Sequence, residues 1–493
     1  MEPAMRTSYT HPLQIAFVRP TPTCGRIGIT FCPGKKQQDA VTGAWHRQLD
    51  VDLDAIASWG AVAVVTLTEA HELKALGVAG LGAEVRARHM DWLHLPIVDV
   101  SVPDADFERH WVDVGEGLRA RLRTGFDILV HCKGGLGRAG LTAARLMVEL
   151  GVPAAEAVAA VRKVRPGAIE TQAQLAFVLA QRPMPEPVPA TSEAAMRDRA
   201  RGALLGLAVG DAVGTTLEFK PRDSYAPLQD MIGGGPFGLQ PGQWTDDTAM
   251  ALALADSLAQ DGALDATDLM QRFVEWHEHG RYSCTGRCFD IGITTRQALA
   301  RWVATGNPMA GSTDPRTAGN GSLMRLAPVA LRHFRNPATL RDVAARQSRT
   351  THAAPEAIDG CVAFAEMLAD AIEGATTSEV LRARAGYAGA IDAIMARSWR
   401  GKPRAALRSS GYVAHALEAA LWSVGASGSF AEAALRAANL GDDADTTAAI
   451  AGQLAGALHG ATGIPEDWRA RLAWADRITA QADALVTAAL AQR

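Results

Sequence analysis

Hydrophobic and polar positions follow two different patterns in the two halves of the chain. In residues 1 to about 180, short apolar runs alternate with longer stretches whose apolar positions recur every three or four residues. Such alternation is typical of an α/β layer fold with a central, mainly parallel sheet flanked by helices. The predicted strands are Gln14–Val18, Ala61–Leu67, Trp92–Val98 and Phe126–Val130, and the predicted helices are Leu53–Trp59, Phe107–Leu122 and Leu141–Leu150.

From Ala194 onward the pattern is helical throughout. Alanine-rich amphipathic stretches follow one another and β-like runs are few, which predicts an all-α domain. The change coincides with Gln181–Pro189, where four of nine residues are proline, a composition that gives a semi-rigid, extended linker. We therefore expect a multidomain protein with an α/β domain over residues 1–182, a linker over 183–194 and an all-α domain over 195–493.

A regular row of glycines stands near the start of the helical half. Gly202, Gly206, Gly210 and Gly214 recur at every fourth residue. Each glycine inside a helix costs about 0.5–1 kcal/mol relative to alanine, so a stripe of them indicates that another helix or a ligand approaches closely. Close helix packing is our interpretation of the glycines themselves.

The composition describes an ordinary globular protein. The 493 residues are 48% hydrophobic and 21% charged, with a net charge of −4, so we expect two or more domains and no nucleic-acid partner. No apolar run is long enough to span a bilayer, so no membrane partner is expected either. Met1–Pro20 lacks the pattern of a signal peptide. The six cysteines follow no disulfide or zinc spacing, and we predict the reducing cytoplasm.

Two acidic clusters in the helical half share one composition. Gln243–Met250 and Asn439–Thr447 each gather aspartates and threonines, contain no cysteine or histidine, and run into an alanine-rich helical pattern. Oxygen ligands alone suit Mg²⁺, Mn²⁺ or Ca²⁺, and paired clusters could build a site for two ions. Alternatively, Thr245 and Asp443 cap helices and the other acids interact favourably with helix dipoles. The repetition of the pattern favours the metal interpretation.

A glycine-rich loop follows the last predicted strand of the α/β half. Gly134, Gly135 and Gly137 let successive backbone N–H groups turn inward to bind an anion, and the following helix adds its positive N-terminus. Arg138 can bind two phosphate oxygens at once. The same groups favour the thiolate form of Cys132, which would make it a nucleophile.

This loop, His131-Cys-Lys-Gly-Gly-Leu-Gly-Arg138, resembles the signature of the cysteine-dependent tyrosine and dual-specificity phosphatases, most closely the kinase-associated branch. The resemblance covers most of residues 10–180 and implies a domain that needs no cofactor. In this family an Asp on a separate loop protonates the leaving oxygen. Asp99 matches that position better than Asp104, which we interpret as an ordinary turn-forming acid. The resemblance implies that phosphate is bound by Lys133, Gly134, Gly135, Leu136, Gly137 and Arg138.

One position departs from this family. A Ser or Thr usually follows the arginine and stabilises the thiolate as the phosphoenzyme breaks down, but here the residue is Ala139. Thr142 lies one turn further along the predicted helix. The domain is then either a phosphatase with slow turnover or a phosphate-binding module.

Five motifs of the helical half stand in the order found in the ADP-ribosylglycohydrolases, especially the dinitrogenase reductase-activating type. They are residues 202–219, 245–248, 319–325, 351–352 and 441–447. The resemblance spans nearly all of residues 196–493. It implies an all-α domain with a binuclear Mg²⁺ or Mn²⁺ centre in a central cleft. The implied metal ligands are Thr245, Asp246, Asp247, Asp443, Asp445 and Thr446.

The same resemblance assigns residues around the metals. Glu218 would lie beside them, and Asp290 matches an acid proposed as proton acceptor in the arginine-specific branch. The alternative for Asp290 is an N-cap of the helix that runs through Arg301. The family often has Asn where this chain has Ile293, so a polar substrate contact would be missing. Positions that match the ADP-ribose-binding loop and cleft are Asn320, Gly321, Ser322, His352 and Tyr412.

Together these patterns predict a bifunctional hydrolase of the cytoplasm. The second domain would remove ADP-ribose from arginine on a protein in a metal-dependent reaction. The first would cleave a phosphomonoester of a protein or a small molecule. In an alternative, the second domain acts on a small ADP-ribosylated metabolite.

Overall fold

The computed structural model describes residues 5–40, 43–261 and 264–491. The chain forms two compact units, Met1–Glu186 and Pro187–Arg493. Residues 181–191 form neither helix nor strand, and the first helix of the second unit begins at Glu193, inside the range predicted as a linker.

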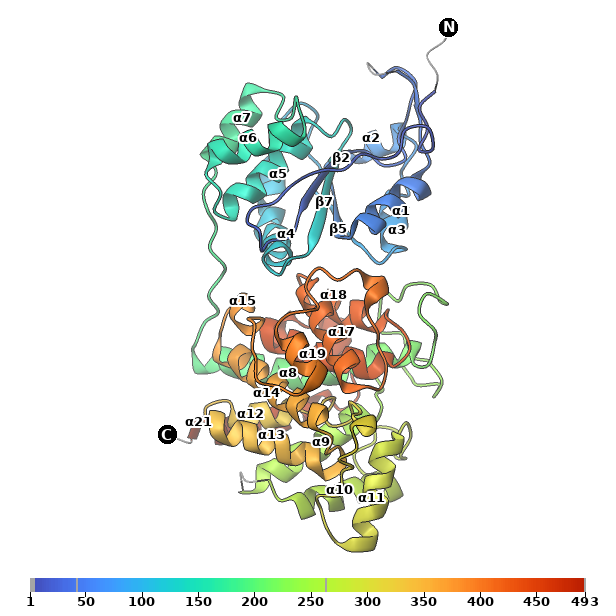
Figure 1. Ribbon diagram of the computed structural model, residues 1–493, viewed down its shortest axis with the longest axis vertical. Helices are drawn as coiled ribbons and strands as arrows, with labels where there is room; N and C mark the ends of the chain where they lie inside the picture. Colours follow the sequence, from blue (N-terminus) through green and yellow to red (C-terminus); the bar gives the residue numbers. More distant parts are fainter. Residues whose placement is uncertain (1–4, 41–42, 262–263, 492–493) are drawn as a thin grey trace. The chain divides into compact units, whose positions relative to one another are not determined.

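A five-stranded sheet forms the centre of the first unit (Figure 1). The strands are β1 (Ala16–Val18), β2 (Ile27–Phe31), β5 (Ala61–Thr66), β6 (Asp91–His94) and β7 (Asp127–Cys132). Their order is β1-β2-β7-β5-β6, and β1 is antiparallel whereas the other pairs are parallel. Parallel strands are covered on both faces and therefore read as continuous apolar runs. Every residue of β2 and β5 is accordingly buried.

Helices cover both faces of this sheet: α1 (Leu49–Trp59), α2 (Ala70–Ala75), α3 (Leu81–Arg86), α4 (Ala105–Arg123), α5 (Gly137–Glu149), α6 (Ala154–Val164) and α7 (Gln172–Ala180). Leu53, Leu73 and Val85 of α1, α2 and α3 share one apolar core with Leu129 of β7. Helices α4 to α7 share the other core with Val130, the next residue of the same strand. Successive residues of a strand point to opposite faces, so β7 contributes to both cores.

The predicted α/β class is confirmed, but one central strand was not predicted. Strand β2 lies next to β7 in the middle of the sheet, yet its five residues include Gly28, which weakens the local strand signal. Helix α5 begins at Gly137, four residues before the predicted start at Leu141, because the end of the glycine-rich loop already belongs to its first turn.

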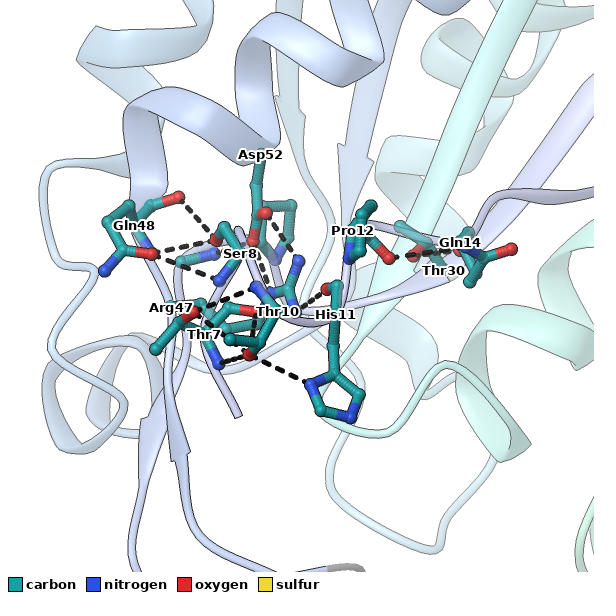
Figure 2. Close-up of polar contacts among 12 residues, drawn as sticks. Thr7, Ser8, Thr10, His11, Pro12, Gln14, Thr30, Arg47, Gln48 and Asp52 are labelled. Carbon is teal, nitrogen blue, oxygen red and sulfur yellow. Dashed lines mark hydrogen bonds and ion pairs between the residues drawn. The ribbon is translucent and has the colours of Figure 1, made fainter. Parts of the chain in front are cut away.

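A buried ion pair holds the N-terminal segment and the turn that leads into a small ribbon of β3 (Lys36–Gln37) and β4 (Trp45–His46) (Figure 2). Arg47 and Asp52 pair at 2.7 Å, and both side chains are almost fully buried. Arg47 also donates to the carbonyl of His11 at 2.6 Å, and Asp52 accepts the N–H of Gly34 at 2.8 Å. Removing one partner of such a pair leaves the other charge uncompensated, so these contacts hold the turn before β3 in place.

The second unit is helical, and no β-strand forms within its described residues (Figure 1). Its α-helices are α8 (Glu193–Gly214), α9 (Asp246–Asp261), α10 (Ala266–His279), α11 (Ile293–Thr305), α12 (Ala327–His333), α13 (Pro337–Thr351), α14 (Pro355–Glu373), α15 (Thr377–Val380), α16 (Gly389–Met395), α17 (Val413–Gly425), α18 (Phe430–Ala438), α19 (Ala444–His459), α20 (Glu466–Arg471) and α21 (Ala475–Ala491). Short 3₁₀ turns occur at Thr215–Leu217, Pro315–Thr317, Arg404–Ala406 and Ala461–Gly463. In the described parts of the chain, no helix is both long and apolar enough to cross a membrane.

Helices α8 and α19 are in direct backbone contact. A Cβ added at Gly206 would lie 2.2 Å from the carbonyl oxygen of Gly452, and one added at Gly452 would lie 2.0 Å from that of Gly206. Gly210 meets Ala448 in the same way, at 2.1 Å. The predicted role of the glycine stripe in close helix packing is therefore confirmed. The contact brings the C-terminal half of α8 beside the first turn of α19.

Candidate active sites

In the first unit, the loop between β7 and α5 forms a cradle around the end of the strand. Cys132 is 3% exposed, and its Sγ accepts the N–H of Gly135 at 3.2 Å. Gly135 has a φ of +70°, and a Cβ there would lie 2.5 Å from the backbone nitrogen of Phe31. Only glycine combines this conformation with such a close approach. Arg165 supports the loop from its other side by donating to the carbonyl of Gly135 at 2.9 Å.

Arg138 is held in place by two carboxylates. The buried guanidinium donates to both oxygens of Glu72, at 2.6 and 2.9 Å, and to the carbonyl of Ile97 at 2.9 Å. It also forms an ion pair with Asp99 at 2.9 Å. Burial by itself would raise the pKa of Glu72, but its hydrogen bonds with Arg138 bring that pKa below its usual value. The fork of Arg138 is thus oriented before any phosphate arrives.

Glu72 was not predicted as a site residue. The residue stands at the third position of α2 and completes a capping box with Glu69, but a Glu at the N-cap departs from the usual Ser or Thr of this pattern. Its bond to Arg138 spans 66 residues of chain, so the pairing itself could not be foreseen.

The other predicted residues of the first unit lie as follows. Lys133 is half-buried in the loop and Leu136 precedes α5. Asp99 has a 53% exposed side chain, and its role as acid stays a prediction. Asp104 accepts the N–H of Phe107 at 2.8 Å and caps α4, so its role is structural, as an N-cap rather than as the turn-forming acid that we expected.

Within the described part of the chain, no other hydroxyl replaces the one that is missing at Ala139. Ala139 is fully buried in the first turn of α5, and the hydroxyl of Thr142 is buried without a hydrogen-bond partner among the described residues. The contacts of Cys132 and Thr142 do not link the two side chains.

In the second unit, carboxylates from five parts of the chain converge. They are Asp211 on α8, Glu218 just after it, Asp246 and Asp247 in the first turn of α9, Asp290 before α11, and Asp443 and Asp445 at the start of α19. Oxygens of Glu218, Asp443 and Asp445 lie within 4.8 Å of one another. These three residues could hold a metal ion.

Hydroxyl and amide groups connect the two acidic clusters. The Oγ1 of Thr245 lies 3.2 Å from a carboxylate oxygen of Asp445, and that of Thr446 lies 3.3 Å from one of Asp247. Residues about 200 positions apart in the chain therefore share one site. Asn320 donates to Asp443 at 2.6 Å. All six residues predicted as metal ligands belong to this site or contact its members.

Asp211 is a residue of this site that sequence analysis did not assign. It is fully buried and accepts the N–H groups of Thr245 and Thr248 at 2.9 and 3.1 Å and the hydroxyl of Thr248 at 2.6 Å. Asp211 therefore orients the first turn of α9. A lone acid inside an apolar, glycine-rich helix was the available signal, because acids are rarely fully buried without a partner.

The site concentrates more negative charge than its surroundings compensate. Burial and neighbouring carboxylates raise the pKa of Asp211 and of Asp443 to about 7 and that of Asp290 to about 11. The same causes raise the pKa of Glu218, Asp246 and Asp247. One carboxylate oxygen of Asp247 is buried without a hydrogen-bond partner among the described residues. Clustered carboxylate and hydroxyl oxygens of this kind fit a hard divalent cation.

A cleft of about 720 Å³ opens onto these carboxylates. Three of its lining residues, Phe219, Asp290 and Asp442, have φ angles of +60°, +61° and +56°. Residues other than glycine rarely adopt this region, and such conformations gather at functional sites.

The N-cap of α11 is Gly292, so the alternative that Asp290 caps this helix is wrong. Ile293 is 73% exposed at the same wall.

The predicted ADP-ribose residues fall into two groups. Asn320, Gly321 and His352 line the cleft. The imidazole of His352 lies against the loop, because a Cβ added at Gly321 would meet its Cε1 at 2.7 Å. Burial lowers the pKa of His352 to about 3, so the ring is neutral at pH 7. Ser322 instead pairs with the hydroxyl of Ser348 at 2.8 Å, and Tyr412 donates to Glu356. The expected contacts of Ser322 and Tyr412 with ADP-ribose stay predictions.

Two protein families match this chain. The sequence profile of the ADP-ribosylglycohydrolase family matches residues 192–493. A second profile, described as "Swiss Army Knife protein, DSP-PTPase phosphatase domain", matches residues 42–178. Both matches fall where the sequence resembles these families.

Individual proteins show the same similarity over the helical half. The ADP-ribosylarginine hydrolase Tri1 of Pseudomonas putida (strain GB-1) is 49% identical over 290 residues, which cover 57% of this chain and 76% of that protein. The ADP-ribosyl-[dinitrogen reductase] glycohydrolase of Rhodospirillum rubrum is 35% identical over 285 residues, 56% of this chain and 91% of that protein. A solved structure described as an ADP-ribosylglycohydrolase-related protein complex is 39% identical, covers 60% of this chain and 99% of its own, and has a TM-score of 0.53.

Proposed function

Because the chain belongs to the ADP-ribosylglycohydrolase family, we propose that its helical unit hydrolyses the bond between ADP-ribose and a modified arginine side chain of a protein. The observation that carries this proposal is the convergence of seven carboxylates at one site, five of which line the cleft: Glu218, Asp246, Asp290, Asp443 and Asp445. The choice of arginine is supported by the similarity to the P. putida relative, which is described as an ADP-ribosylarginine hydrolase.

We propose that the site works with divalent metal ions. Thr245, Asp246, Asp247, Asp443, Asp445 and Thr446 would hold two ions, Mg²⁺ or Mn²⁺, which would polarise the ribose and orient water. The cluster of like charges supports this role, because a cation would offset the burial and the mutual repulsion that raise the pKa values of these acids. The unpartnered buried oxygen of Asp247 also supports it.

The chain's own residues supply the remaining chemistry. Hydrolysis breaks the bond between C1″ of the ribose and the guanidine nitrogen, adds a hydroxyl from water to C1″ and returns a proton to the nitrogen. Asp290 lines the cleft, and with cations bound to offset the neighbouring carboxylates it would accept the proton of water. Glu218 accepts the N–H of Ala444 at 2.7 Å and so fixes the start of α19. The bond from Asn320 to Asp443 holds the loop that would take the diphosphate.

The test measures release of ADP-ribose from an ADP-ribosylarginine protein with Mg²⁺, with Mn²⁺ and with chelator. Wild type should release ADP-ribose only with metal, and Asp443→Ala should lose activity and metal binding together. Asp342→Ala, which removes an exposed acid of α13, is the matched control and should behave as wild type.

The possible negative results separate the parts of this proposal. Release from a serine-linked conjugate or a small ADP-ribosylated metabolite, but not from arginine, would overturn the substrate assignment. Absence of metal binding in calorimetry would overturn the metal centre.

For the first unit we propose phosphomonoester hydrolysis with Cys132 as nucleophile. The thiolate would attack phosphorus, the leaving oxygen would take a proton from Asp99, and water would then release phosphate from the cysteine. The contact between the Cys132 Sγ and the N–H of Gly135, together with the oriented fork of Arg138, supports this role. The missing hydroxyl at Ala139 would slow the second step.

Burst kinetics with a chromogenic phosphate ester test this second activity. We expect a burst of about one product per enzyme followed by slow turnover, and no burst from Cys132→Ser. Cys24→Ser, which changes a cysteine outside the cradle, should keep the burst. Tight phosphate binding without any burst would instead make the first unit a phosphate-binding module.

A further inference from the structure

A second hollow, of about 440 Å³, lies beside the phosphate cradle of the first unit. It shares two residues with the cradle, since its wall includes Lys133, which follows Cys132, and Glu72, which binds Arg138. Lys36 of β3 and His71 of α2 contribute the other basic groups. We call this hollow, lined by Lys36, His71, Glu72 and Lys133, the Lys36 pocket.

The wall of the Lys36 pocket, with the Arg138 that pairs with Glu72, carries more positive than negative charge. In the described ranges neither Lys36 nor Lys133 forms an ion pair. Glu72 is already bound through both oxygens to Arg138, so its charge is compensated. Asp39 is the remaining acid of the wall, and it is exposed. An anion that enters the pocket would therefore meet two lysines and the amide groups of Gln37 and Gln38.

The backbone of Lys36 is held in place before any ligand arrives. Its backbone N–H donates to the carbonyl of Leu76 at 2.9 Å, and its side chain passes over Gly77, where an added Cβ would meet its Cδ at 3.2 Å. The turn before it is held by the buried pair of Arg47 and Asp52 (Figure 2). A backbone that is already ordered loses less entropy when a ligand binds.

We propose that the Lys36 pocket binds a second phosphate group of the phosphatase substrate while the first occupies the cradle at Cys132. This inference rests on the proposed phosphatase activity of the first unit. Lysine ammonium groups bind phosphate as strong point charges. The phosphatase unit thereby selects substrates that carry two phosphates, either on one small molecule or on neighbouring residues of a peptide.

The experiment compares kcat/KM for adenosine 3′,5′-bisphosphate, the two adenosine monophosphates, a doubly and a singly phosphorylated peptide, and p-nitrophenyl phosphate. Wild type should prefer a bisphosphate by at least about tenfold, the size of one charge-assisted contact. The preference should appear in KM. The arm that shows it, nucleotide or peptide, identifies the source of the second phosphate.

Matched variants assign the preference to the pocket. Lys36→Met should lose it and keep its activity on p-nitrophenyl phosphate, whereas Lys36→Arg should retain most of it. Lys163→Met removes an exposed lysine of α6 and should change neither value. His71→Gln is a second, independent variant that should weaken the preference without disturbing the backbone of β3.

Two results would overturn the inference: equal kcat/KM for one and two phosphates in wild type, or an unchanged preference in Lys36→Met. If no phosphate ester is hydrolysed at all, the proposed phosphatase activity fails. The pocket is then tested by calorimetry on Cys132→Ser. Tighter binding of bisphosphates than of monophosphates, lost with the additional Lys36→Met change, would support the pocket, and equal binding would refute it.

Discussion

The contact between α8 and α19 predicts a large effect from one methyl group, added by Gly206→Ala. The new Cβ would lie 2.2 Å from the carbonyl oxygen of Gly452 and 2.9 Å from the ring of Phe430, whereas ordinary contact begins at 3.4 Å. The helices would have to separate by about 1 Å, and overpacking of this kind costs about 1–3 kcal/mol. Replacement of a helical glycine gains only about 0.5–1 kcal/mol. Because the obstacle is helix backbone, which cannot rotate away, we expect a net loss of about 2 kcal/mol.

Scanning calorimetry measures this loss as a shift of the unfolding transition of the helical unit. A loss of about 2 kcal/mol should lower its midpoint by about 3 °C in a domain of this size. Gly360→Ala is the matched control, because Gly360 is also buried within a helix but its added Cβ would meet only the side-chain ends of Val413 and Ile391, at 3.1 and 3.5 Å. The control should be as stable as wild type or slightly more stable.

The same variant tests whether helix packing supports the acidic site. Asp211 lies on α8 and Asp445 on α19, so separation of the helices should also weaken binding of Mg²⁺ or Mn²⁺ in calorimetric titration. Equal stability of Gly206→Ala and Gly360→Ala would refute the reasoning, since it would mean that the two helix backbones are not in contact.

Three further predictions concern the first unit. Ala139→Ser should raise the steady-state rate with a chromogenic phosphate ester by about tenfold, the value of one hydrogen bond to the thiolate, without changing the burst; an unchanged rate would show that the hydroxyl does not limit turnover. Glu72→Gln should lower kcat/KM about tenfold because it weakens the charge-assisted hold on Arg138, and full activity would remove Glu72 from a positioning role. Burial lowers the pKa of Lys35 from 10.5 to about 8. Between about pH 8 and pH 10.5 the unfolded state therefore binds more protons than the folded state, so the free energy of unfolding of wild type should rise with pH in this range. Urea denaturation measures the free energy of unfolding of Lys35→Met and of wild type. The value for Lys35→Met minus that for wild type should fall from pH 7 to pH 10, and a constant difference would contradict this.

Local patterns determined much of this protein from sequence alone. The order of apolar runs predicted the α/β class of the first unit and the helical class of the second, both of which are confirmed. The phosphate loop was recognisable because the residues that carry its chemistry, among them Cys132 and Arg138, all lie within eight consecutive positions. The glycine stripe predicted close packing because each glycine destabilises a helix relative to alanine, and a close contact can compensate for that cost.

Tertiary structure decided which distant groups meet. Strand β2 gains its place from pairing with β7, a contact between segments about 100 residues apart, and its own five residues carry a weak signal. Asp211 and Glu72 were missed because their partners, Thr245 and Arg138, lie 34 and 66 residues away.

The physical reason is that secondary structure depends on residues close together in the chain, whereas a site depends on residues that are far apart in it. Backbone conformation and helix or strand periodicity depend on a few neighbouring residues, so the sequence displays them directly. The environment of a carboxylate depends on what else is packed around it. Burial and the carboxylate of Asp445 raise the pKa of Asp211 because α8 lies against α19, and that contact belongs to the folded chain.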